Sequence, residues 1–500
     1  MLRSTDRRIA VARVLARLAS ACVAARILLG AAPASAQAAP PGGHEDAAFD
    51  FMNLLAQHGL HDINEESWNA YGQFTYISSW KLPFSAPYTN ANGSVKSLVP
   101  DAERSFTGSF TLFFGVRLWP GGEGYFVPEV ISERPLSGLN GIGGAIQNFE
   151  LQKTGSETPQ LYRARTYLRQ TIGLGGTRTP GESNPMQLAT GIDSRRVVLT
   201  AGNFTILDVF DRNSVSWDPR QTFFNMAFMT YASWDFPSDA RGYSWGGTAE
   251  LYWDDWAFRL GQITPPQDPN TLPIDFRIWK YYGTEVELEH DHVLLGQPGA
   301  ARLLAYRNHV FTGSFADAIT AFNADPSKNN AANCGANFNY GSGNATAPDL
   351  CWVREPHVKL GIGLDLEQFV APDIGVFFRG MYSDGRTEVD AYNPADRSVS
   401  LGAVAKGTTW KRPFDVTGVG FGMSWISQSH AQYLAMGGVD GFIGDGHLRQ
   451  SAEGVVEGFY SVNLLKAIWL SADYQFLWNP GYNADRGPVN IIGGRVHAEF

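Results

Sequence analysis

A two-residue alternation along unusually long segments constrains the fold of this chain more than any other feature of its sequence. From Phe106 to Leu118 the even positions are mostly apolar, and the odd positions are mostly small or polar and include Arg117. This pattern predicts a β-strand with one apolar face. The segment is longer than a typical soluble strand of about 5–6 residues, and it suits a tilted membrane-crossing strand of roughly 9–11 residues with extensions.

Similar alternation recurs along the chain, so the sequence predicts a large sheet. The expected strands are 68–78, 106–118, 123–133, 161–173, 195–203, 243–253, 255–263, 274–290, 301–312, 357–369, 373–384, 414–426, 450–463, 467–478 and 489–500. An open sheet edge would leave backbone groups unpaired in hydrocarbon, so the sheet must close. Two periplasmic termini require an even number of strands, and we place a sixteenth within 428–449. The predicted fold is all-β: a transmembrane antiparallel β-barrel of sixteen strands with short periplasmic turns and long extracellular loops.

Composition excludes a helical membrane protein. Beyond residue 36 the chain has no run of about 18 apolar residues, and its mean hydropathy is −0.18. Charged residues make up 18% and aromatic residues 13%, which suits a membrane barrel or a large secreted β-protein.

Residues 1–36 have the pattern of a signal peptide: five arginines up to Arg17, an apolar stretch from 18 to 32 and the small residues 34–36. A mitochondrial presequence and a lipoprotein signal at Cys22 are alternatives. Removing the segment changes the net charge from −10 to −15, which disfavours a nucleic-acid partner. We expect a short periplasmic segment over 37–66, with a helix or a linker at 51–55, and the barrel over 67–500.

The remaining cysteines, Cys334 and Cys351, bracket a polar segment rich in Asn, Gly and Ala. In an oxidising compartment such a pair predicts one loop disulfide, and two free thiols are the alternative. No second Cys pair or His cluster lies nearby, so a metal site is not expected.

Several blocks of the sequence identify a family. They are 115–123, 128–130, 135–139, 161–165, 168–170, 199–204, 239–243, 364–368, 479–489 and 495–497. With these blocks the chain resembles the carbohydrate-selective porins of the Gram-negative outer membrane, the OprB group. The resemblance implies a 16-stranded barrel in the cell outer membrane that passes glucose and related small sugars by passive diffusion. A polysaccharide exporter and, less favoured, a barrel enzyme are the alternatives.

The partners expected of such a barrel are small carbohydrates, outer-membrane lipid and lipopolysaccharide, and the assembly machinery. The apolar face of the last strand ends in Phe500, which resembles the assembly signal of bacterial outer-membrane proteins. The chain is expected to be a monomer or a homotrimer. No cofactor is expected.

Because the apolar face of each strand must contact lipid, the opposite face is expected to line the lumen. The candidates for a sugar path or pore lining are Arg117, Arg163, Arg165, Arg169, Arg259, Arg277, Trp279, Tyr281, Glu285, Glu287 and Glu289. Sugar hydroxyls can bond to carboxylates and guanidinium groups, and the apolar sugar face stacks on aromatic rings. The alternative is that these charges only solvate the lumen and balance each other.

Loop 204–242 contains two segments, 207–211 and 223–228, that are too apolar for a fully solvated loop. We expect it to fold inward with a helix, and a lid over the barrel mouth is the alternative. A catalytic site is not indicated: His290, His292 and His309 have no marked Ser partner, and three glutamates on one face form a ladder rather than a tuned pair.

Overall fold

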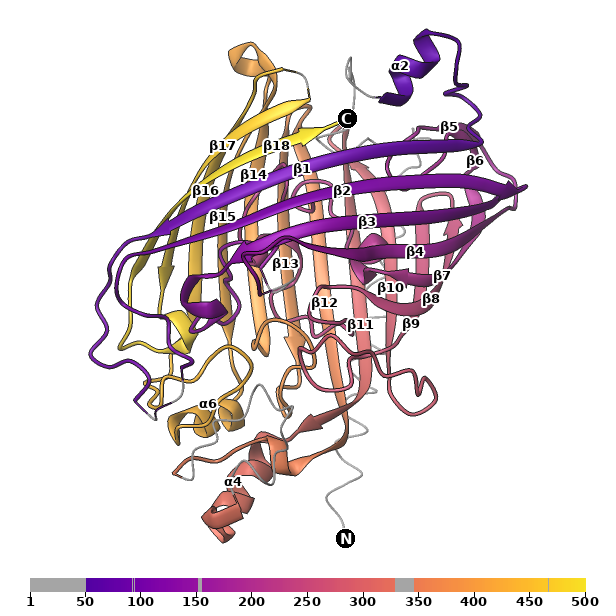
Figure 1. The fold of residues 1–500 in the computed structure, drawn as a ribbon. Helices are drawn as coiled ribbons and strands as arrows, with labels where there is room; N and C mark the ends of the chain where they lie inside the picture. The colour runs from indigo at the N-terminus through magenta and orange to yellow at the C-terminus, as the bar shows by residue number, and fades with distance from the viewer. Residues whose placement is uncertain (1–50, 92, 94, 152–154, 329–345, 466) are drawn as a thin grey trace. The chain divides into compact units, whose positions relative to one another are not determined.

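The alternating segments form long strands that pair with their neighbours in chain order and close into an antiparallel barrel of sixteen strands (Figure 1). This computed structural model describes residues 51–500 except 92, 94, 152–154, 329–345 and 466. The barrel strands are β1 (Trp68–Lys81), β2 (Glu103–Trp119), β3 (Gly122–Arg134), β4 (Gln160–Gly173), β7 (Arg195–Phe204), β8 (Ser244–Trp253), β9 (Trp256–Ile263), β10 (Tyr282–Leu294), β11 (Gln297–Gly313), β12 (Arg354–Ala371), β13 (Ile374–Ser383), β14 (Arg397–Gly407), β15 (Arg412–Trp425), β16 (Glu453–Asn463), β17 (Ile468–Trp478) and β18 (Val489–Glu499).

The remaining described elements are short and lie between the barrel strands or before them. They are the two-stranded sheet of β5 (Arg178–Gly181) and β6 (Thr190–Asp193), and the helices α2 (Phe51–Gln57), α3 (Met226–Met229), α4 (Phe315–Ala324) and α6 (Gln428–Ala435).

The barrel closes between its first and last strands, with Gln73 opposite Glu499 and Lys81 opposite Ile491. Beyond the last paired strand residue, Phe500 and Gly72 exchange two backbone hydrogen bonds, of 2.7 and 2.9 Å. The Phe500 ring packs over Gly72 and leaves no room there for a Cβ atom. Closure satisfies the backbone groups that an open edge would expose to hydrocarbon.

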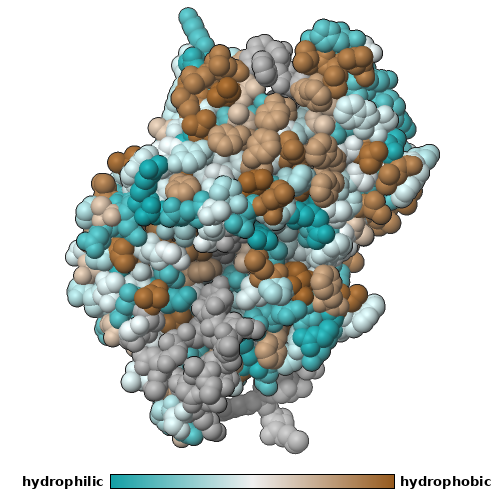
Figure 2. Space-filling model, viewed as in Figure 1, coloured by the Kyte–Doolittle hydropathy of each residue, from teal (hydrophilic) through white to brown (hydrophobic). Residues whose placement is uncertain are grey.

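The two faces of each strand differ in character. Along β2, the odd-numbered Ser105, Thr107 and Ser109 are buried inside the barrel, whereas Phe110 and Phe114 are exposed on the outside. Figure 2 shows apolar residues gathered over the strands on the side in view. An apolar outer face and a polar inner face are the arrangement that a bilayer requires of a barrel.

One predicted strand lies elsewhere. The sixteenth strand is β14, which lies between the predicted strands 373–384 and 414–426 and not within 428–449. Residues 428–435 form α6 instead. Because β14 combines small residues such as Ser400, Gly402 and Ala403 with few large apolar ones, its alternation is weak in the sequence and its pairing with β13 and β15 defines it.

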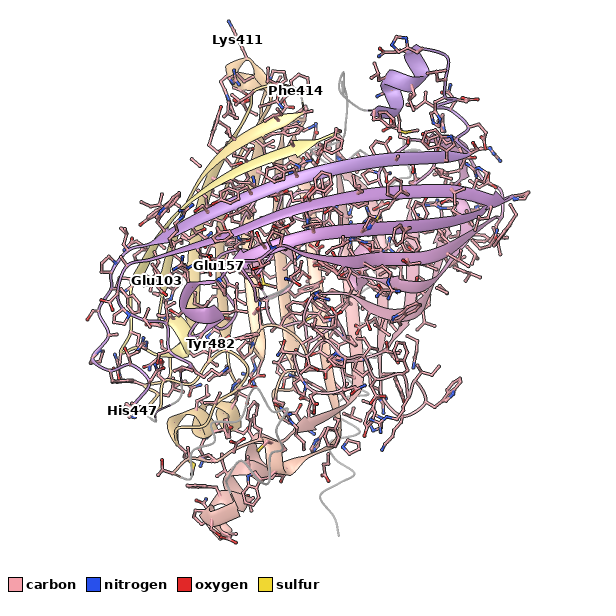
Figure 3. All side chains as sticks on the ribbon, in the orientation of Figure 1. Glu103, Glu157, Lys411, Phe414, His447 and Tyr482 are labelled. Atoms are coloured by element: carbon pink, nitrogen blue, oxygen red, sulfur yellow. The ribbon has the colours of Figure 1, made fainter. Side chains whose placement is uncertain are left out.

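The connections differ between the two ends of the barrel. Most connections at one end are turns of two to four residues, such as 254–255 and 408–411, although the longer connection 174–194 with β5 and β6 also lies there. Long loops such as 205–243, 314–353 and 426–452 lie at the other end. Figure 3 shows Lys411 and Phe414 at the end with the short turns, and His447 and Tyr482 at the opposite end. In outer-membrane barrels the short turns face the periplasm, so α4 and α6 are extracellular.

This orientation predicts how introduced cysteines react on cells. Asn323 in α4 is exposed, and Leu465 in a short turn is 68% exposed. A membrane-impermeant maleimide should label an Asn323→Cys variant on intact cells and a Leu465→Cys variant only after the outer membrane is permeabilised. The parent chain sets the background, and labelling in the reverse order would contradict the orientation.

Candidate functional site

The inner face of the wall carries most of the residues that the sequence nominated. Arg165, Arg169 and Arg259 lie on it, and Glu285, Glu287 and Glu289 alternate along β10 with residues that face outward. Arg117 lies inside at the periplasmic end of β2, where its guanidinium donates hydrogen bonds to the backbone oxygens of Glu66 (2.8 Å) and Ala189 (3.2 Å). It therefore holds the segment before β1 against the turn that contains β5 and β6.

Arg163 faces outward, which corrects the prediction of one row with Arg165 and Arg169. The pairing of β3 with β4 shifts between Val127, opposite Arg165, and Pro128, opposite Arg163. The irregularity gives β4 one extra residue, Ala164, and a bulge of this kind reverses the faces of the residues beyond it. The exposed Arg163 guanidinium lies 5.0 Å from the centre of the Trp245 ring.

Arg277, Trp279 and Tyr281 are not part of the wall, because β10 begins at Tyr282 and not at residue 274. The predicted inward placement of Trp279 is wrong: its side chain is 92% exposed and belongs to a turn before the strand. Arg277 is also exposed and pairs with Asp275. Apolar residues occur at alternate positions here, as they would in a strand, but the segment pairs with none of the described barrel strands.

Loop 205–243 folds into the barrel, as its apolar content predicts, although its helix α3 is only one turn long. Phe223, Phe224 and Phe228 are almost fully buried, and the Phe223 ring packs against Phe377 (5.8 Å) and Phe459 (5.0 Å) of the wall. The loop is thus part of the packed interior of the barrel.

Charged side chains of the wall bind this loop. Arg379 of β13 is 1% exposed; its Nε lies 3.1 Å from Asp211, and its Nη1 donates to the backbone oxygens of Ser216 (3.2 Å) and Phe228 (3.0 Å). The Glu457 carboxylate of β16 accepts hydrogen bonds from backbone amides of the loop, including that of Asn225 at 3.0 Å. Hydrogen bonds from a charged guanidinium are stronger than neutral ones, so the contacts of Arg379 in particular fix the position of the loop.

A second segment, 141–151, also enters the barrel, which was not predicted. The Glu453 carboxylate of β16 accepts hydrogen bonds from the amides of Gly143 (2.8 Å) and Ala145 (2.9 Å). Ile146 and Leu151 are buried in the same core as loop 205–243. The signal that could have indicated this is a glycine-rich, apolar stretch inside a predicted external loop.

Oppositely charged side chains from adjacent strands form a belt across the inner wall. Its members are Arg259, Glu287, Glu289, Arg302, Asp365 and Glu367. Arg259 lies 2.7 Å from Glu287, and Arg302 lies 3.2 Å from Asp365. Two arginines bridge four carboxylates in the belt. Three of its members, Arg302, Asp365 and Glu367, were not among the predicted residues.

Glu285 and Glu287 cannot touch a solute, because both are fully buried beneath loop 205–243. Trp234 Nε1 donates to Glu285 at 3.3 Å, and the Asp211 amide donates to Glu287 at 2.8 Å. The prediction of these two glutamates as sugar-path residues is therefore corrected: they bind the loop.

A column of alternating Arg and Tyr side chains runs along the inner side of β4. It comprises Arg241, Tyr162, Tyr243, Arg165, Tyr167, Arg169 and Tyr125. Arg169 lies 5.4 Å from the ring centres of both Tyr125 and Tyr167, and these rings stack at 4.9 Å. Arg165, Arg169 and Arg241 stay partly exposed. We call this set the Arg–Tyr column.

Arg165 links the column to the inward loop. Its Nε and Nη2 donate to the two carboxylate oxygens of Asp208 at 2.7 and 2.8 Å. Asp208 also closes a one-turn helix, since its side chain accepts a hydrogen bond from the Thr205 amide. The bidentate pair therefore positions the start of loop 205–243.

The extracellular loops pack around a core of their own, centred on His430. Its ring stacks on Phe315 of α4 at 4.1 Å, and its two nitrogens lie 3.1 Å from Asp396 and 3.1 Å from Asp440. Burial opposes the charged form of the ring, but the two carboxylates outweigh it and raise the pKa of His430 to about 9. An imidazolium at neutral pH therefore joins α4, α6 and the loop before β14.

Other expectations concern cysteines, metals and helices. Cys351 takes part in a disulfide, but its predicted partner Cys334 lies outside the described residues, so the pairing stays a prediction. Within the described part of the chain, no cluster of His, Cys, Asp and Glu suited to a metal ion is found. None of the helices in the described ranges is long and apolar enough to cross a membrane.

A closed sixteen-stranded barrel with an apolar outer face, a charged inner face and inward-folded loops defines an outer-membrane porin. The model of the OprB family, carbohydrate-selective porins, matches residues 110–500. The chain therefore belongs to the OprB family of carbohydrate-selective porins of the Gram-negative outer membrane, and it is a channel rather than an enzyme.

The fold matches that of a solved porin, and the chain is also similar to other solved barrels. Pseudomonas putida OprB, in its high-pH structure, is 14% identical, with 87% of this chain and 94% of that chain covered and a TM-score of 0.63. Salmonella typhi OmpF in complex with daunomycin is 9% identical, with 87% and 98% covered and a TM-score of 0.43. No curated protein sequence gives a significant match.

Proposed function

We propose that small sugars pass through this porin along the Arg–Tyr column. The observation that carries the proposal is the contrast in exposure: Arg165 and Arg169 are partly exposed, whereas Glu285 and Glu287 are fully covered by the loop. Of the inward-facing residues nominated for sugar contact, Arg117, Arg165 and Arg169 are partly exposed, and Arg165 and Arg169 lie together in the column.

The chemistry of the column suits a pyranose. Guanidinium groups donate hydrogen bonds to sugar hydroxyls. The rings of Tyr125, Tyr167 and Tyr243 are buried and support the arginines through cation–π contacts. The partly exposed Arg241, Arg165 and Arg169 provide several similar contacts in succession rather than one tight site. Transport needs such contacts, because each must be weak enough to release the sugar to the next.

Replacing Arg169 tests the path. A hydrogen bond to a charged group contributes about 1.5–3 kcal/mol, so an Arg169→Ala variant should bind glucose about tenfold more weakly, the loss equivalent to roughly 1.4 kcal/mol. The measurement is the block of ion current by glucose, titrated in planar bilayers. An Arg169→Lys variant, which keeps the charge but loses the forked donor, should show an intermediate affinity.

The matched control is Arg195→Ala. This arginine is also half-exposed and also lies near an aromatic ring, but it pairs with Asp254 at the periplasmic rim (2.7 Å). Its loss should leave glucose affinity unchanged. If Arg169→Ala altered ion selectivity but not glucose affinity, the column would be a charge lining only, and the sugar path would be withdrawn.

We further propose the division of the chain and its route of assembly. Residues 1–36 act as a signal peptide, 37–66 form a short periplasmic segment that includes α2, and 67–500 form the barrel. The assembly machinery is proposed to recognise the last strand through Phe500, whose ring lies on the outer face, stacked 6.1 Å from Phe110.

A further inference from the structure

Four exposed basic side chains occur on the outside of the barrel near its extracellular rim. Arg163 lies at the start of β4, Arg277 and Lys280 lie just before β10, and Arg307 lies on β11 opposite Thr284. Leu303, on the same face of β11 as Arg307, is 47% exposed, whereas Leu304 on the opposite face is fully buried. We call these four residues the basic rim patch.

Aromatic rings connect the members of the patch. The Arg163 guanidinium lies over Trp245 at 5.0 Å, and Trp245 meets Phe276 edge-on at 6.2 Å. The strands that carry Arg163 and Trp245, β4 and β8, flank β7 in the barrel. The first half of the patch therefore spans three neighbouring strands at one rim.

The second half of the patch is built around two tyrosines. Arg277 and Lys280 lie 4.8 and 5.0 Å from the ring of Tyr281. Arg307 donates a hydrogen bond of 3.1 Å to the Tyr282 hydroxyl, and its guanidinium lies 5.7 Å from that ring. These contacts order cations that would otherwise be free to move in solvent.

Large apolar side chains are exposed beside the charges. Phe276 is 64%, Ile278 40% and Trp279 92% exposed. Water is a poor environment for such a group of side chains, but the boundary between lipid headgroups and acyl chains accommodates aromatic and basic residues together. The combination indicates a lipid surface rather than a soluble ligand.

The basic rim patch keeps a net positive charge after the ion pair between Asp275 and Arg277 is counted. Asp275 is buried and pairs with Arg277 at 2.5 Å. The Arg163, Lys280 and Arg307 cations face outward, where a charge is tolerated only near the interface. An anion in the outer leaflet would be attracted to them.

We propose that the basic rim patch binds the phosphate groups of a lipid A-type phosphorylated glycolipid of the outer leaflet. The guanidiniums and the ammonium bind the phosphates, and Phe276, Ile278 and Trp279 pack against the sugar and acyl part of the same lipid. Arginine forms forked hydrogen bonds to phosphate, and two phosphates on one lipid can engage different cations of the patch. The proposal is independent of the sugar path.

Native mass spectrometry of the full-length protein with added lipid A tests this binding. The variant is Arg277→Gln/Lys280→Gln/Arg307→Gln, and heat-modifiable gel migration verifies its folding. We expect the lipid A-bound fraction to fall at least about tenfold, the equivalent of one lost charge-assisted contact. Lipid A with one phosphate should bind the parent protein more weakly than lipid A with two.

The matched control removes three cations from the opposite rim: Arg195→Gln/Lys411→Gln/Arg412→Gln. Lys411 and Arg412 are exposed and Arg195 is partly exposed. It changes the net charge equally and should keep its lipid A. The proposal is overturned if the rim-patch variant binds lipid A like the parent, if the control loses as much, or if phosphatidylglycerol binds as well as lipid A. Should the triple variant not fold, Lys280→Glu, which lies outside the strands, takes its place with the same expected loss.

Discussion

An Arg379→Met variant is expected to show a severalfold larger single-channel conductance and to lose its block by sugars. Arg379 is the wall residue that binds loop 205–243 through Asp211 and through two backbone oxygens. Removing one partner of a buried ion pair costs about 3–5 kcal/mol, because the other charge stays behind unpaired. The backbone ladder of the wall does not depend on this pair, so the loop should detach before the barrel unfolds.

Conductance in planar bilayers and proteolysis within 205–243 measure this effect, and heat-modifiable migration shows that the barrel remains intact. A double variant, Arg379→Met/Asp211→Asn, removes the orphaned charge and should recover part of the parent conductance. An unchanged conductance in the single variant would contradict the role of Arg379 as an anchor of the loop.

An Arg165→Ala variant should shift ion selectivity toward cations by a severalfold change in the permeability ratio. Its bidentate partner Asp208 is largely buried and would keep its negative charge without compensation. Two charges 4 Å apart interact by about 4 kcal/mol at an effective dielectric constant near 20, so the loss changes the potential inside the barrel. The sugar block should weaken as well, because one member of the Arg–Tyr column is removed.

Reversal potentials in a salt gradient report the selectivity. The double variant Arg165→Ala/Asp208→Asn restores charge balance without restoring the guanidinium, so its selectivity should return toward that of the parent while its sugar affinity stays low. If both properties returned together, charge alone would explain the effect, and Arg165 would not belong to the sugar path.

Much of the wall could be predicted because strand faces are decided locally. In β2 and β9 the alternation is uninterrupted, and residues such as Thr111 and Arg259 are buried while Phe110 and Phe258 are exposed. Prediction failed where the alternation was weak or interrupted. Strand β14 has small residues on both faces, and the bulge at Ala164 reverses the face of Arg163.

The loops could be predicted only in part. The apolar content of 205–243 indicated that it must be buried, but not which residues would hold it. Its anchors come from far along the chain: Arg379 and Asp211 are 168 positions apart, and Glu457 and Asn225 are 232 apart. Separations of 51 and 76 positions from their loop partners likewise concealed the burial of Glu285 and Glu287, which alternation alone would place in an open lumen.

The sequence by itself therefore determined a closed membrane barrel with an apolar outer and a polar inner face, since period-two alternation follows from the geometry of each strand. It also carried the family blocks that identify a carbohydrate-selective porin. Only the tertiary structure decided which inward charges remain accessible, where the bulge reverses a face, and which rim cations gather on the outside. Those outcomes depend on contacts between residues far apart in the chain, and on how completely one segment covers another.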